Sequence, residues 1–253
     1  MNENVIELKN VSKTFCDFWL RPTVKAVDGL SLAVKKGEVF GLLGPNGSGK
    51  STTIKMILGL LAPSAGEVRL FSLPPQSVAA REKLGYLPEL SYLHPFLTAS
   101  ETIRYYAGLC GLGRREAKER SAQLLEMVGL SDVASRAVGG FSKGMARRVA
   151  LAASLVGKPE LLIMDEPTSG LDPISMKEVK TLIRALADGG MTILTTSHLL
   201  ADAEDVCDRV MIVNHGKSVA EGAVGELGTS LEEFFLAKVG DARDFKLARF
   251  LKG

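Results

Sequence analysis

Cysteine is scarce in this chain of 253 residues, and its three members, Cys16, Cys110 and Cys207, lie far apart. They form no CxxC pair, so we expect neither a disulfide framework nor a zinc site, and we favour reduced cysteines packed in a cytosolic protein. Long apolar runs are also missing: residues 161–164 are far short of the roughly 20 that cross a bilayer. The N-terminus lacks the basic and then apolar order of a secretion signal. Any role at a membrane is therefore expected to come through a partner.

An excess of charge of one sign is absent too. The chain has 31 basic and 29 acidic side chains, for a formal net charge of +2. This balance gives no general case for nucleic-acid binding, and no nucleic-acid partner is expected. The hydrophobic share of 46% predicts a sizeable core. The length suits one large domain, or a core with an inserted lobe.

Short β-rich runs alternate with helical patterns along most of the chain. Strands are expected at residues 5–15, 38–44, 161–165 and 191–197, and helices at 50–60 and 172–190. The later helix has one apolar face and ends at a glycine; these residues are Val179, Leu182, Ile183, Leu186 and Gly189. This alternation predicts an α/β fold with a mainly parallel central sheet. The early strands are expected to form an antiparallel side sheet.

The strand signal disappears from about Ala99 to Val156, where residues 100–112, residues 114–130 and a segment after Phe141–Met145 have helical patterns. We interpret this region as a helical lobe inserted into the core. A single domain over residues 1–253 is expected, with the core at about 1–88 and 158–225 and the lobe at about 89–157. A helical C-terminal tail is expected at about 226–253, where Ser230 and Glu233 have capping-box spacing.

A phosphate-binding pattern stands between the second expected strand and the helix that follows it. It matches the P-loop consensus in full: Gly44, Pro45, Asn46, Gly47, Ser48, Gly49, Lys50 and Ser51. Glycines let backbone N–H groups surround phosphate oxygens, and the helix adds its positive N-terminal end. We expect Lys50 to reach the β- and γ-phosphates, Ser51 to ligate Mg²⁺, and Thr52 to bond the α-phosphate. The alternative is a glycine-rich turn that matches by chance.

Two carboxylates, Asp165 and Glu166, close the buried strand at residues 161–164. Ligands bind at the carboxyl ends of strands in such sheets. Asp165 is expected to hold Mg²⁺ and Glu166 to polarise an attacking water as general base, unless the pair only starts a solvated loop. His198 follows the strand at 191–197. A lone histidine is usually structural, but at this strand end it can contact the γ-phosphate and orient the water.

Six motifs occur in a fixed order: the P-loop, GYLPE at 85–89, FSKGM at 141–145, LLIMDEP at 161–167, SGLD at 169–172, and His198. Over residues 5–225 the chain resembles the nucleotide-binding subunits of ABC transporters. The resemblance implies a P-loop NTPase fold with a RecA-like core and a helical lobe. It also implies head-to-tail dimerisation with two ATP molecules at the interface.

FSKGM resembles the ABC signature, which in this family closes over the nucleotide held by the opposite subunit. Ser142 and the backbone of Gly144 would then bind that γ-phosphate. Without the resemblance, a helix cap by Ser142 is the preferred interpretation. The segment departs from the commoner LSGGQ at Phe141, Lys143 and Met145.

Three further family contacts are expected. Glu89 stands where the Q-loop usually has Gln, and we expect it to sense the metal. Asp172 resembles the D-loop residue at the dimer interface; an ordinary loop is the alternative for both segments. The adenine is expected to stack on Phe15, or on Phe18 or Trp19, because residues 16–25 look like a longer loop than usual.

The sequence therefore predicts an ATPase subunit in which ATP closes a dimer to power transport through a separate membrane permease. A homodimer is favoured, and a paired heterodimer is the alternative. Export is the favoured direction, and the cytoplasmic face of the membrane is the expected location. Residues 87–106 are the expected docking surface. The alternatives are a soluble ABC-type ATPase of repair, translation or cofactor assembly, and a non-hydrolysing module, against which Glu166 and His198 both argue.

Overall fold

A computed structural model describes residues 4–19, 21–226, 231 and 233. Its centre is a six-stranded sheet in the spatial order β5-β6-β7-β3-β8-β9. The strands are β3 (Val39–Leu43), β5 (Leu84–Leu87), β6 (Leu161–Met164), β7 (Thr192–Ser197), β8 (Arg209–Asn214) and β9 (Lys217–Ala223). All neighbours pair in parallel except β8 and β9. The prediction of an α/β fold with a mainly parallel sheet is confirmed.

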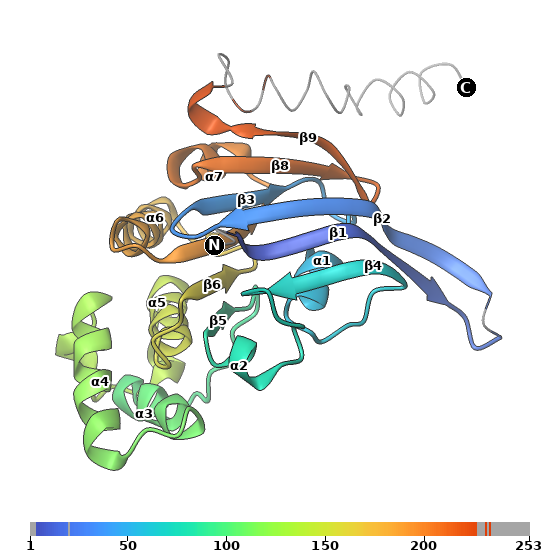
Figure 1. Cartoon of the computed structure of the whole chain (residues 1–253). Coiled ribbons are helices and arrows are strands. Elements are labelled where there is room, and N and C mark those ends of the chain that lie inside the picture. The colour runs from blue at the N-terminus through green and yellow to red at the C-terminus, as the bar shows by residue number, and fades with distance from the viewer. Residues whose placement is uncertain (1–3, 20, 227–230, 232, 234–253) are drawn as a thin grey trace.

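The predicted side sheet is also confirmed. It has the order β2-β1-β4 and is antiparallel, with strands β1 (Asn4–Cys16), β2 (Pro22–Lys35) and β4 (Ala65–Leu70). The prediction of a long loop over residues 16–25 is wrong at Cys16, which ends β1, and at residues 22–25, which begin β2. The two strands form a hairpin that extends beyond the rest of the sheet (Figure 1). Asp17 closes its turn: one carboxylate oxygen accepts hydrogen bonds from the N–H groups of Trp19 and Arg21.

Three helices form the lobe at one end of the molecule (Figure 1). They are α3 (Ala99–Leu109), α4 (Arg114–Met127) and α5 (Lys143–Ser154), with 3₁₀ turns at Ser131–Val133 and Val138–Gly140. Thr98 begins α3 in a capping box with Glu101. We call these three helices the helical lobe.

The remaining helices cover the sheet. They are α1 (Lys50–Ile57), α2 (Val78–Arg81), α6 (Pro173–Asp188) and α7 (Leu200–Val206), followed by a 3₁₀ turn at Val224–Glu226. The apolar face predicted for α6 is buried at Val179 and Ile183, and the helix ends at Gly189 as expected. The capping residue predicted at Ser230 lies outside the described residues, and so does the predicted helical tail apart from residues 226, 231 and 233. Among the residues described, no helix combines the length and apolarity that a bilayer span requires.

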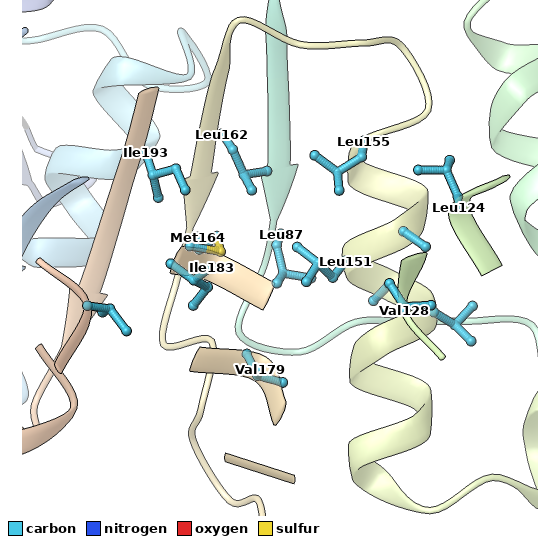
Figure 2. Close-up of a cluster of buried hydrophobic side chains, with 14 of the residues drawn as sticks. Leu87, Leu124, Val128, Leu151, Leu155, Leu162, Met164, Val179, Ile183 and Ile193 are labelled. Carbon is cyan, nitrogen blue, oxygen red and sulfur yellow. The ribbon is translucent and has the colours of Figure 1, made fainter. Parts of the chain in front are cut away.

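One apolar cluster joins the helical lobe to the sheet. Figure 2 shows Leu87 and Met164 of the sheet beside Leu151 of α5, with Val128, the residue that follows α4, next to that helix. Full burial of each such leucine contributes about 1.5–3 kcal/mol to the free energy of folding. Because α5 lies between the sheet and the rest of the lobe in this cluster, it is the helix that joins the lobe to the core. A second cluster, which includes Phe40 and Ile54, fills the space between the other face of the sheet and the side sheet. The strand ends that carry the site are therefore fixed from both faces.

Candidate functional site

The P-loop lies between β3 and α1, where its backbone approaches two neighbouring strands. Gly44 and Gly49 have φ angles of 153° and 108°. A Cβ at Gly44 would lie 2.1 Å from the carbonyl oxygen of Val213, and one at Gly49 would lie 2.5 Å from that of Ala26. A residue with a side chain would not fit at either position. The two glycines therefore allow the loop to pass close to the backbone of Val213 and Ala26.

Lys50 is the first residue of α1 and is 6% exposed. Its ammonium donates hydrogen bonds to the carbonyl oxygens of Gly44, at 2.7 Å, and Pro45, at 3.3 Å. The same nitrogen lies 3.7 Å from a carboxylate oxygen of Glu166. The positive charge is therefore held inside the loop that a phosphate would enter.

Glu166 and His198 meet beside this lysine. The Oε2 atom of Glu166 lies 2.7 Å from Nδ1 of His198 and accepts a longer bond, 3.4 Å, from the His198 backbone N–H. The Glu166 backbone has a φ of 48°, a left-handed conformation that is unusual for a residue with a side chain. This turn brings the carboxylate, which is 8% exposed, between an imidazole and an ammonium group. A buried carboxylate held in this way can accept a proton from a nearby water.

Thr196 orients both acidic residues, and the sequence analysis missed it. Its hydroxyl donates to Oδ1 of Asp165 at 2.7 Å and accepts from the N–H of Glu166 at 3.0 Å. Thr196 is fully buried on β7, the strand next to β6. Polar residues inside an otherwise apolar strand were the available signal, because residues 195–197 of that strand are Thr, Thr and Ser.

A cavity of about 710 Å³ opens in front of these groups. Its walls include the following predicted residues: Asn46, Gly47, Ser48, Gly49, Lys50, Ser51, Thr52, Glu89, Glu166 and His198. Further wall residues are Ser169, from the SGLD motif, and Val24 and Lys25, from the stretch expected as a long loop. Ala26, His215 and Gly216 are on the wall without having been predicted there. Phe15, Phe18 and Trp19 are not on the wall, so their contact with adenine stays a prediction. The cavity thus gathers the P-loop, both candidate catalytic groups and the Q-loop position in one space.

The donor groups at this cavity fit a nucleotide with Mg²⁺. The hydroxyl of Ser51, on the wall, is a hard oxygen ligand of the kind that Mg²⁺ prefers. The carboxylate of Asp165 is another, but Asp165 is not among the wall residues, nor are Gly44 and Pro45. Within the described part of the chain, no group of three or more His, Cys, Asp or Glu residues could hold a metal ion by itself. Mg²⁺ commonly binds through one or two protein ligands together with substrate phosphates, and this is the arrangement that these residues permit.

The predicted signature and D-loop residues lie at two adjacent helix starts. Ser142 caps α5 by accepting a hydrogen bond from the N–H of Met145 at 3.2 Å. Asp172 caps α6 by accepting bonds from the N–H groups of Ile174 and Ser175. Hydrogen bonds from Ser175 hold the pKa of Asp172 below its ordinary value. Neither cap lies on the wall of the cavity, and the roles of Ser142, Gly144 and Asp172 toward a partner's nucleotide stay predictions.

Comparisons with known proteins agree with this geometry. The family model described as "ABC transporter" matches residues 27–169. The chain belongs to the ABC transporter family. Within this family it is 43% identical over 207 residues to the linearmycin resistance ATP-binding protein LnrL of Bacillus subtilis, with 81% of the chain and 67% of that protein covered. It is 42% identical over 209 residues to the daunorubicin/doxorubicin resistance ATP-binding protein DrrA of Streptomyces peucetius, with 82% and 63% covered.

The fold agrees with a solved member of this ABC transporter family. The chain is similar to the ATP-binding cassette MJ0796, described as dimeric, in a post-hydrolysis state and bound to ADP and Pi. That similarity has a TM-score of 0.77 and 27% identity, and covers 87% of this chain and 98% of the cassette. The chain spans about two thirds of the length of the two resistance proteins.

Proposed function

We propose that this chain is the ATPase subunit of an ABC transporter that exports its substrate through a separate membrane permease. The observation that carries the proposal is the contact of Glu166 with His198, at 2.7 Å, beside the buried Lys50 of a complete P-loop. A cassette that only bound ATP would need the loop and the lysine, but not a base aimed at the phosphate. Hydrolysis is therefore the chemistry that this arrangement supports best.

The chain's own residues would divide the work of hydrolysis. Lys50 would leave the carbonyl oxygens of its loop and bind the β- and γ-phosphates, while Ser51 and Asp165 would hold Mg²⁺, which neutralises developing negative charge. Glu166 would accept the proton of the attacking water, and His198 would hold that carboxylate in place. Glu89, on the wall of the same cavity, would contact the metal from the Q-loop.

Dimer closure would convert this chemistry into work. Ser142 and the start of α5 would bind the γ-phosphate of the ATP held by a second copy, with Asp172 at the interface. ATP would favour the closed state because it binds both subunits, and hydrolysis would remove that bridge. The dimeric description of the MJ0796 cassette supports this step.

The permease is expected to bind a groove between the sheet edge and the helical lobe. A cavity of about 510 Å³ lies there, and its walls include Tyr86, Tyr92 and Tyr106. Tyr92 is 84% exposed. Tyrosine suits such an interface because it combines apolar area with a polar end. This placement would hold the chain at the cytoplasmic face of the membrane. Export is favoured because the similar proteins LnrL and DrrA are both resistance ATP-binding proteins.

Gentle detergent extraction of native membranes, followed by affinity capture and mass spectrometry, tests the transport part of the proposal. A stoichiometric multi-span protein is expected with the wild type. It should be lost with Tyr92→Asp and kept with Leu60→Asp, a matched change of an exposed residue outside the groove. Recovery with soluble partners only would contradict transport and favour a soluble ABC-type ATPase of repair, translation or cofactor assembly.

A further inference from the structure

Arg147 is a buried arginine on α5 that binds backbone oxygens. It is 7% exposed, and its guanidinium forms no ion pair with any carboxylate in the described part of the chain. Its acceptors are the carbonyl oxygens of Pro88, Glu89 (3.1 Å), Asp165 (3.0 Å), Glu166 (3.1 Å) and Pro167 (2.9 Å), and the Ser91 hydroxyl (3.1 Å). All five N–H groups of a guanidinium can be used on such a set. One side chain of α5 therefore connects two other segments, residues 88–91 and residues 165–167.

Stability alone is a poor explanation for this arginine. Burial lowers the pKa of Arg147 to about 10, against the opposing effect of the charges of Asp165 and Glu89. The side chain is still protonated at neutral pH, so the fold keeps a cation out of water. A buried charge is often no more stabilising than an apolar residue of similar size. The groups that Arg147 binds therefore say more about its role than its contribution to the free energy of folding does.

Those acceptors belong to the two loops that carry acidic groups of the cavity. Nη1 binds the backbone of Glu89 in the Q-loop, and Nη2 binds the carbonyl oxygens of both Asp165 and Glu166. Glu166 is in the left-handed conformation, which costs about 1–2 kcal/mol for a residue with a side chain. Arg147 binds the carbonyl oxygen of Glu166 in that turn, and Arg147 is not on the wall of the cavity. It thereby fixes the direction of the Glu166 carboxylate without touching it.

The other end of the connection is the start of α5. Gly144 lies one helical turn before Arg147 and packs so closely on Ser175 that a Cβ there would be 2.1 Å from the Ser175 hydroxyl. Since an α-helix is stiff over one turn, a shift of its N-terminus moves the guanidinium as well. The backbone at Asp165 and Glu166, and that of the Q-loop at Glu89, would move with the guanidinium.

We propose that Arg147 is a positioning residue that links the location of α5 to the alignment of Glu166 and Glu89. The inference rests on the proposed function, in which Glu166 is the base. Through this link, a subunit whose α5 is displaced has a misaligned base. Seating of α5 on a partner's nucleotide then favours hydrolysis in the subunit's own cavity.

The test is steady-state ATP hydrolysis by the full chain with Arg147→Lys. Lysine keeps the charge but has three N–H groups on one nitrogen in place of five on a planar fork, so it cannot reproduce all of the contacts with the two loops. We expect kcat to fall by about 100-fold, as for a catalytic group displaced by about 1 Å, while KM and the Kd for Mg-ATP change by less than about threefold. The matched control is Arg148→Lys. Arg148 is the next residue on α5, but it contacts Val128 and Glu178 and no residue of the cavity.

A second measurement covers the case in which Arg147→Lys does not fold. In Arg147→Ala, free guanidinium ion at millimolar concentration should restore part of kcat, and methylammonium should not. A merely structural role predicts equal losses of kcat and nucleotide affinity and no selective rescue, and that result would overturn the inference. An Arg147→Lys enzyme with wild-type kcat would also overturn it while leaving the proposed function intact. A wild-type chain without ATPase activity would contradict both the inference and the proposed function.

Discussion

A small number of buried polar contacts decides what this chain can do. The carboxylate of Glu166 lies between His198 and Lys50, and Thr196 holds the backbone N–H of Glu166 from the neighbouring strand. These groups come from three places that are distant in sequence: the start of α1, the end of β6 and the end of β7. Each has a partner, so the arrangement is set before any ligand binds. Such preorganisation is what a base needs to act on a water rather than merely lie near it.

Replacing Glu166 by Gln separates binding from turnover. The amide has nearly the same shape as the carboxylate but cannot accept the proton of an attacking water. We expect kcat for ATP hydrolysis to fall by about 100-fold or more, with the Kd for Mg-ATP within about threefold of the wild type. Phosphate release and equilibrium nucleotide binding measure the two quantities. Wild-type turnover by Glu166→Gln would contradict the assignment of the base.

Much of the site can be predicted from the sequence, because many of its residues belong to short motifs. The spacing of Gly44 to Ser51 and the acidic pair after an apolar strand are patterns of adjacent residues. Arg147 and Thr196 escape such an analysis because their partners lie 18 or more residues away. The interval of three from Gly144 to Arg147, on the buried face of α5, is the one local hint of a buried arginine.

At the scale of elements, the contact between α5 and α6 joins the signature segment to the D-loop. Gly144 of α5 lies against Ser175 of α6, whose hydroxyl donates to Asp172 at 2.7 Å. The two helix starts therefore form one unit. Their close approach depends on the missing side chain of Gly144, a requirement that the pattern FSKGM does not reveal by itself.

Gly144→Ala is expected to separate these two helix starts. The added Cβ would lie 2.1 Å from the Ser175 hydroxyl and 2.6 Å from its Cβ, so a helix must move. We expect a destabilisation of about 1–3 kcal/mol and a marked loss of ATPase activity. Thermal unfolding and turnover measure both effects, and adding Ser175→Gly should restore part of each.

Gly108→Ala in α3 is the matched control, because nothing lies within 4 Å of a Cβ at that position. Alanine there should be neutral, or stabilise the helix by up to about 1 kcal/mol. If Gly144→Ala behaved in the same way, the two helix starts would not be in the close contact that we infer.

The elements themselves differ in how far the sequence predicts them. The apolar runs of β3 and β6, and the more polar β7, are buried on both faces, and the predictions for these strands are confirmed. Residues 16–25 contain Pro22 and the exposed aromatic residues Phe18 and Trp19, which favour a loop, yet pairing with β1 makes residues 22–25 part of a strand. Partners across a sheet are decided by tertiary structure, so propensity within a short window cannot supply them.

At the scale of the whole molecule, the chain has a cavity that fits a nucleotide, and the residues predicted to form the signature lie away from that cavity. Ser142 and Asp172 cap helices beside one another, and neither lies on the cavity wall. In our account these groups complete the site of a second copy. ATP is then the bridge between two subunits, and closure of the dimer is the event that a permease converts into transport.

Light scattering of the Glu166→Gln chain in the presence of Mg-ATP or Mg-ADP tests this central claim most directly. We predict a mass of twice the 27.1 kDa chain with ATP and a single chain with ADP. Adding Lys50→Ala to the same variant should give a single chain under both conditions, because nucleotide binding is weakened. A single chain with ATP, when bound ATP is measured at one per chain, would contradict the account.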